Sequence, residues 1–462
     1  MAVAALGILR AMADARSDDA VPRVAPAGFK RDVGLLTVVR FAATGAGFLT
    51  SVLGARVLGP ESLGAAGVAL TAGAVSALVA NGGLNIATTY FLGRRPDDRP
   101  AVIRNSLTLT VAASSLAALL VVIVVGVLAP SLLGLRDGGL ILATALVAAG
   151  IISFEVSGGM LLGLDRRPAY LAQQILEGLG SLVVTAIALL LVAPTATGMV
   201  AAAAIAYLVA AVVSIVIAHR TVGGPWLGFD LGYTRDALGM GLRGQIGNIL
   251  NFLNLRLDLL LVPWLVDLGA AGIYLVVLRM SEAVTQIASA AAALLFPAVT
   301  RADVRQTALT ERTVRGTLLV VVTAGIAIAI LAPWLLGVFF GAAFESGTTT
   351  LRITMLAMLP LSVVRLITGD LKGRGRAGLT SIAAGAALVV TVVLDLLLIP
   401  AFGIEGAAVA SLVAYSVGAA ILLVAYRRVT SGRLRALVPT IGDARMLLSA
   451  GMGVVRRARP AP

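Results

Sequence analysis

The chain has 462 residues, of which 59% are hydrophobic and only 13% are charged, and its mean hydropathy is +1.00. A soluble domain carries about 25% charged residues, so this composition excludes an ordinary soluble protein. The absence of cysteine and the single histidine exclude disulfides, thiol catalysis and a histidine-based metal centre. The net charge of +13 comes largely from arginines between apolar runs, which favours a topological role over nucleic-acid binding.

Apolar runs recur along the whole chain, and each is long enough to cross about 30 Å of hydrocarbon as a helix. We therefore predict an all-α polytopic membrane protein with twelve transmembrane helices. The predicted spans are 33–55, 63–91, 103–129, 139–162, 170–193, 197–219, 237–264, 268–296, 315–339, 347–370, 377–399 and 404–426.

Two segments of the chain recur about 205 residues later. SLVVTAIALLLVAP at 181–194 matches ALVVTVVLDLLLIP at 387–400, and Leu63–Gly67 matches Leu268–Gly272. A fixed offset indicates a duplicated unit. Because an even number of spans gives both units the same orientation, we predict two six-helix parallel repeats around a central cavity. Asp395 replaces Leu189 in the second copy, and its place near a predicted outer helix end suggests a solvated side chain.

The predicted organisation has five parts: an N-terminal tail (1–32), an N-lobe (33–219), a linker (220–236), a C-lobe (237–426) and a basic C-terminal tail (427–462). Arginines gather in both tails and in alternate loops. By the positive-inside rule, this pattern predicts a multi-pass protein of the cytoplasmic (inner) membrane with both termini in the cytoplasm. The short segment 446–455 cannot span the bilayer.

Charged side chains inside the predicted spans are the main functional signal, since each would cost roughly 2.5–3.5 kcal/mol at the bilayer centre. They imply a hydrated or polar interior, or close pairing. These residues are Arg40, Arg243, Arg256, Arg279, Arg352, Arg365, Glu155, Glu177, Asp258, Glu282 and Asp395.

The seventh predicted helix carries a polar stripe of Arg243, Asn248, Asn251, Asn254 and Asp258, which lie within about 140° at 100° per residue. Such a stripe is typical of a cavity wall, and hydrogen bonding between helices is the alternative. Arg256 projects from the opposite side of this helix.

Other intramembrane charges also have two interpretations. Arg279 and Glu282 can pair at i,i+3, either as a structural ion pair or as a substrate contact. Glu155 and Glu177 are candidates for proton coupling or for structural hydrogen bonds. Arg40 and Arg365 reach either a cavity or the cytoplasmic surface, the latter near Asp370 for Arg365.

Four short patterns resemble a known group. They are LGPESLG at 58–64, Arg256-Leu257-Asp258 before Gly272-Ile273-Tyr274, Phe296-Pro297, and IPAFGIEGAA at 399–408. In this order they resemble the polysaccharide-biosynthesis branch of the multidrug/oligosaccharidyl-lipid/polysaccharide flippase superfamily, over residues 33–428.

This resemblance implies a flippase that moves undecaprenyl-pyrophosphate-linked oligosaccharide by alternating access, with no catalytic step, metal or cofactor. The expected partners are the lipid-linked substrate, membrane lipids, and glycan polymerase or glycosyltransferase machinery. Expected substrate-binding residues are Arg40, Arg243, Arg256, Arg279, Arg365, Asn248 and Asn251, and expected ion-coupling residues are Asp258, Glu282, Glu177 and Glu155.

Two other functions remain open from sequence. A cation-coupled multidrug or metabolite exporter of the same superfamily would need an acid-dominated cavity. A membrane glycosyltransferase or polymerase would need acids or a large catalytic loop at the outer surface, where the predicted loops are short.

Overall fold

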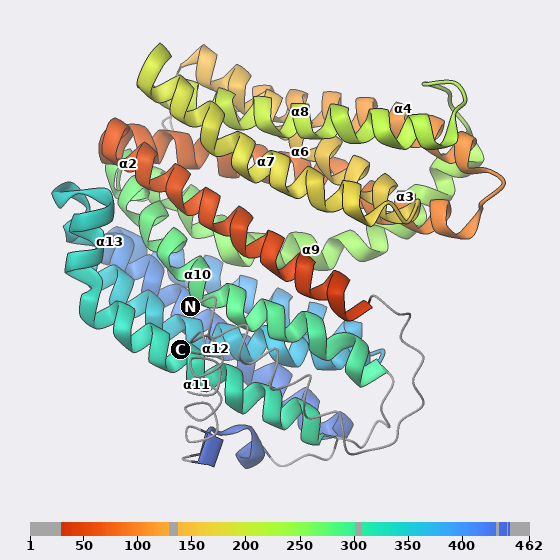
Figure 1. Ribbon diagram of the computed structural model, residues 1–462. Coiled ribbons are helices and arrows are strands. Elements are labelled where there is room, and N and C mark those ends of the chain that lie inside the picture. Colours follow the sequence, from red (N-terminus) through yellow and green to blue (C-terminus); the bar gives the residue numbers. More distant parts are fainter. Residues whose placement is uncertain (1–28, 129–136, 301–306, 431–433, 441, 444–462) are drawn as a thin grey trace, which may run out of the picture.

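The computed structural model describes residues 29–128, 137–300, 307–430, 434–440 and 442–443. In these ranges the protein is helical and contains no strand, as predicted (Figure 1). The α-helices are α2 (Phe29–Asn81), α3 (Leu84–Arg94), α4 (Arg99–Leu120), α6 (Gly138–Gly163), α7 (Arg167–Ile187), α8 (Ala196–Val222), α9 (Leu231–Leu265), α10 (Leu268–Thr300), α11 (Ala308–Leu335), α12 (Thr348–Gly373) and α13 (Ala377–Thr430).

The described residues contain ten helices long and apolar enough to cross a membrane. Two of them hold two spans each, because α2 turns at Gly59 (φ 71°) and α13 turns at Gly403 (φ 58°), positive φ angles that favour glycine. The chain reverses at the second turn, since a methyl group on Gly406 would lie 2.3 Å from the Leu398 carbonyl oxygen. Counting each arm separately gives twelve segments, which confirms the predicted number.

Several predicted helix boundaries differ from the structure, and two of these differences concern the packing at α9. The span predicted at 63–91 is broken at Gly82 (φ 52°) and Gly83 (φ 78°), which separate α2 from α3. This break brings the chain against α9, where a methyl group on Gly83 would lie 2.3 Å from the Gly241 carbonyl oxygen. The helix predicted to start at 237 begins at Leu231, because Asp230 caps it by accepting a hydrogen bond from the Tyr233 amide at 2.8 Å.

The chain forms two adjacent groups of helices. Figure 1 shows α4, α6, α7 and α8 on one side of α2, and α10 to α13 on the other. The first arm of α2 and helix α9 lie between these groups, so both contribute to the boundary between the two halves.

The two copies of the repeated LGAAG motif pack directly against each other at this boundary. A methyl group on Gly64 would lie 1.8 Å from the Leu268 carbonyl oxygen, and one on Gly272 would lie 1.9 Å from the Pro60 carbonyl oxygen. Backbone thus meets backbone where α2 crosses α10. Small residues permit such close helix crossings in membranes, and neither position has room for a side chain larger than that of glycine.

We predict that Gly64→Ala destabilises the protein, because the added methyl group meets backbone that no side-chain rotation can move. Overpacking of this kind typically costs about 1–3 kcal/mol. Thermal unfolding of the detergent-solubilised protein should therefore occur at a lower temperature than in the wild type.

The matched control for Gly64→Ala is Gly180→Ala in α7, where nothing lies within 4 Å of the added methyl group. Both changes replace a helical glycine by alanine, so they share the backbone-entropy effect. Equal melting temperatures for the two variants would contradict the proposed role of the crossing.

Candidate functional site

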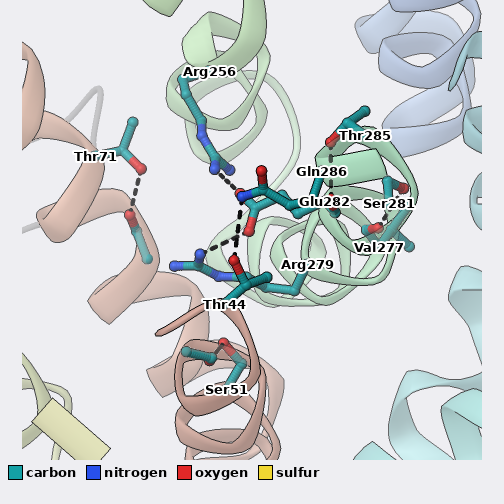
Figure 2. A network of polar contacts seen from close by, with 12 residues as sticks. Thr44, Ser51, Thr71, Arg256, Val277, Arg279, Ser281, Glu282, Thr285 and Gln286 are labelled. Atoms are coloured by element: carbon teal, nitrogen blue, oxygen red, sulfur yellow. Dashed lines mark hydrogen bonds and ion pairs between the residues drawn. The ribbon is translucent and has the colours of Figure 1, made fainter. Parts of the chain in front are cut away.

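A cluster of arginines around one carboxylate lies where α9 and α10 meet. Arg256 of α9 donates to Glu282 Oε1, and Arg279 of α10 donates to Glu282 Oε2 at 3.0 Å. Figure 2 shows the two guanidinium groups reaching Glu282 from two sides. The predicted i,i+3 pair is confirmed, and a second arginine shares the same acid.

A third arginine adds to the positive charge of this cluster. Arg365 of α12 interacts electrostatically with Glu282 and with the Tyr415 hydroxyl. Its Nε is buried and has no hydrogen-bond partner in the part of the chain that the structure describes. The cluster around Glu282 therefore holds three guanidinium groups, and the side chains of Arg256 and Glu282 keep 22% and 28% of their surface exposed.

The N-terminal half of the protein also reaches this cluster. Gln286 of α10 donates to Thr44 Oγ1 of α2 at 3.2 Å, as Figure 2 shows. Glu177 of α7 hydrogen-bonds the Tyr207 hydroxyl and interacts electrostatically with Arg279. Arg279 thus lies between an acid of its own half and an acid of the other half.

Glu155 of α6 has a separate partner. Asn81, the last residue of α2, donates to Glu155 Oε2 at 2.6 Å. Glu155 also interacts electrostatically with Tyr207, so the two predicted acids of the first half lie near the same phenol.

A second buried cluster joins α9 to α10 and α13. Asp258 accepts hydrogen bonds from the Tyr274 hydroxyl, from Ser411 Oγ at 3.3 Å and from the Leu259 amide at 2.8 Å. Asp395 of α13 lies close enough to interact electrostatically with Asp258. Asp395 is fully buried, and neither carboxyl oxygen has a hydrogen-bond partner among the described residues.

These positions correct two predictions. Asp395 is not a solvated helix end, because its side chain is fully buried and lies near Asp258 of α9. The polar stripe of the seventh helix is not one cavity wall either. Asn254 accepts a hydrogen bond from Thr391 Oγ1 at 2.8 Å, and Asp258 is buried, so both pack between helices.

The remainder of the stripe differs from these two residues. Asn248 and Asn251 are exposed, and Asn248 donates to Gln245 Oε1 at 3.3 Å. The side chains of Arg40 and Arg243 lie outside the described part of the structure, so their predicted roles stay predictions.

Asp370, the acid near which Arg365 was expected to reach the cytoplasmic surface, has other partners. Asp370 is fully buried and accepts from Arg374 Nε at 2.7 Å and from Thr310 Oγ1 at 2.6 Å. Arg374 directly follows the last residue of α12 and lies four positions beyond Asp370, so it reaches this acid.

Sequence reasoning missed several hydroxyl partners in these clusters, among them Tyr207, Thr391 and Ser411. Tyr207 carried a usable signal, since it is a lone hydroxyl within an apolar stretch of α8. Thr391 and Ser411 carried none, because hydroxyl side chains are common along spanning helices.

An apolar pocket of about 590 Å³ lies away from both clusters. It is lined by parts of α4, α6 and α8 together with Trp226 and Leu227. No charged side chain lines this pocket, so it offers no group that would bind an anion by charge. Among the described residues, no group of three His, Cys, Asp or Glu side chains is placed to hold a metal ion.

Comparison with known proteins gives a family and a fold. Residues 29–303, more than half of the chain, match the family model described as polysaccharide biosynthesis protein. No curated protein matches the chain.

Three solved structures share its fold at low identity. An inward-facing MATE multidrug resistance transporter of the MOP superfamily is 15% identical, with a TM-score of 0.67, covering 86% of this chain and 98% of that one. The lipid II flippase MurJ in an inward closed conformation is 13% identical, with a TM-score of 0.72, covering 93% and 94%. A MOP superfamily transporter from Pyrococcus furiosus is 15% identical, with a TM-score of 0.51, covering 87% and 95%.

We predict that Asp395→Leu raises the melting temperature. A buried carboxyl group without partners loses its hydration and gains no hydrogen bond in return. Leucine already occupies the corresponding buried position of the first repeat, Leu189. Thermal unfolding of the solubilised protein measures the change.

Asp258→Leu is the comparison, and it should lower the melting temperature because it removes the acceptor of Tyr274 and Ser411. A fall for both variants would contradict this account.

Proposed function

We propose that this chain, which belongs to the polysaccharide biosynthesis protein family, moves a lipid-linked oligosaccharide with a pyrophosphate headgroup across a membrane, without a catalytic step. The observation that carries the proposal is the excess of arginine over carboxylate around Glu282, at the boundary between the two halves.

The chemistry of this cluster suits a pyrophosphate. Arginine presents a planar fork of donors that matches phosphate oxygens, and it keeps its charge in an apolar setting. Arg256, Arg279 and Arg365 come from three different helices. A headgroup bound among them would be held from several sides, while its hydrocarbon tail stays in the lipid.

Alternating access would use the boundary between the halves. The crossing of Gly64 and Gly272 is rigid backbone contact and suits a pivot. Side-chain contacts elsewhere along the boundary can be broken and remade, since they involve few hydrogen bonds each. Gln245 donates to the Leu78 carbonyl at 2.8 Å, and Arg56 donates to the carbonyls of Phe339, at 3.0 Å, and Val338.

We further propose that the acids supply ion coupling. Asp258 and Asp395 form a buried pair with hydroxyl groups nearby, and two carboxylates so close are relieved by binding a proton or a monovalent cation. In the other half, Glu177 and Glu155 flank Tyr207 and are the second coupling candidates. Glu282 belongs instead with the arginines.

One observation favours a second candidate function. The buried Asp258–Asp395 pair would also suit a cation-coupled exporter of small molecules within the same superfamily. Drug sensitivity of a pump-deficient host that carries this protein separates the two functions, since the flippase should give no resistance.

The membrane orientation predicted from the sequence is consistent with this function. The tails (1–32 and 427–462) and the linker would face the cytoplasm, and the two lobes would span the cytoplasmic membrane. Glycan polymerase or glycosyltransferase machinery would then supply the substrate on one side and consume it on the other.

We predict that the triple variant Arg256→Gln/Arg279→Gln/Glu282→Gln abolishes glycan export at unchanged membrane abundance. The triple change removes the anion site without leaving Glu282 unpaired, which would itself destabilise the protein. Export is measured as surface polysaccharide in a flippase-deficient host, with immunoblots for abundance. Wild-type export by this variant would sink the assignment of the site.

We predict that Asp258→Asn and Asp395→Asn uncouple transport from the ion gradient. Each change removes a charge that a bound proton or cation would neutralise. Transfer of a fluorescent lipid-linked substrate between the two leaflets of proteoliposomes should respond to an imposed proton or sodium gradient in the wild type and not in either variant. Gradient-driven transfer by both variants would exclude this pair from coupling.

A further inference from the structure

Glu282 occupies the centre of the proposed headgroup site. Each of its two carboxyl oxygens is bound by a different arginine, Oε1 by Arg256 and Oε2 by Arg279. Two guanidinium groups that would bind an anion are therefore already occupied by the protein's own carboxylate.

We propose that Glu282 is a resident counterion of the headgroup site, and that a headgroup with at least two negative charges displaces it from Arg256 and Arg279. This inference rests on the proposed function and adds to it a reason for selectivity. It makes Glu282 a competitor of the substrate rather than one of its ligands.

The positions of the two arginines make the displacement possible. Arg279 lies three residues from Glu282 on α10, so this pair belongs to a single helix turn. Arg256 reaches Glu282 from α9, so its contact spans two helices and can be given up separately. The carboxylate is 28% exposed and is not sealed in the core.

Arg365 supplies the first contact for an entering anion. It forms no ion pair in the described structure, and its Nε lacks a hydrogen-bond partner. An anion can therefore meet a free guanidinium group before any existing ion pair breaks.

The charge of the entering group decides whether displacement is favourable. A singly charged anion offers Arg256 and Arg279 no more than Glu282 already does. A pyrophosphate offers several negative charges and more acceptor oxygens than a carboxylate does. Its attraction to the arginines is stronger because the Coulomb energy is proportional to the product of the two interacting charges. The resident carboxylate would thus keep singly charged anions such as chloride out, and it would favour a pyrophosphate, with its greater charge and larger number of acceptor oxygens, over a monoester.

A purely structural role for Glu282 makes the opposite prediction. If the carboxylate only holds the arginines in position, its removal should disorder them and weaken anion binding. If it competes with the substrate, its removal should strengthen binding. The sign of the change in affinity therefore separates the two roles.

The test measures binding of farnesyl pyrophosphate and farnesyl monophosphate to the purified full-length chain in nanodiscs by calorimetry. We expect Glu282→Gln to bind the pyrophosphate about tenfold more tightly than the wild type does. We also expect it to discriminate less against the monophosphate. Glycan export should meanwhile slow, because a tightly held headgroup is released slowly.

Two further variants serve as a control and as an intermediate case for the change in affinity. Glu345→Gln removes an exposed acid of the segment between α11 and α12 and should leave both affinities unchanged. Glu282→Asp keeps the charge with a shorter reach, so it should hold one arginine rather than two and give an intermediate affinity. It also serves as the test if Glu282→Gln fails to fold.

The outcomes distinguish this inference from the proposed function. Tighter binding by Glu282→Gln, with an intermediate value for Glu282→Asp, supports the counterion role. Binding by the wild type together with equal or weaker binding by the variants overturns that role alone. Absence of pyrophosphate binding in the wild type and in both Glu282 variants overturns the proposed function and the counterion role together.

Discussion

The backbone contact between the two copies of the LGAAG motif fixes how the rest of the protein is arranged. Gly64 and Gly272 let α2 and α10 cross without intervening side chains. Because these helices touch, Thr44 of the first half reaches Gln286 of the second, and Glu177 comes near Arg279. The polar groups of both halves therefore meet at the same boundary at which the repeated glycine motif contacts its own copy.

The two halves have diverged in charge while keeping similar apolar helices. The first half places Glu155 and Glu177 near Tyr207. The second carries the arginines around Glu282 and, separately, the pair Asp258 and Asp395. A charge inside a membrane is tolerated only with partners, so these groups cluster instead of spreading along the helices. The second half therefore contains the clustered arginines, and the acids are distributed between both halves.

Sequence reasoning predicted what depends on composition and local spacing. The helices, the number of spans and the Arg279–Glu282 pair follow from short-range patterns, and the duplication follows from a recurrence at a fixed offset. The contact of Arg256 with Glu282 follows from neither, since it depends on how α9 crosses α10. The burial of Asp395 depends on how the helices around it pack, which no local pattern shows. A helical wheel of α9 places Asn254 and Asp258 with Asn248, yet it cannot say that neighbouring helices cover only the first two.

Helix α9 links the two clusters of the second half. Arg256 and Asp258 are two residues apart and point to different sides, one toward Glu282 and the other toward Tyr274 and Ser411. A shift of α9 that repacks Asp258 must therefore also move Arg256. Among the candidate spans of the described residues, the part of α9 from Gly244 to Leu265 is the least apolar. Two sites that bias the same element are energetically coupled, and the coupling is reciprocal. An ion bound beside Asp258 would change the affinity of the arginine cluster, and a bound headgroup would change the affinity for the ion by the same factor.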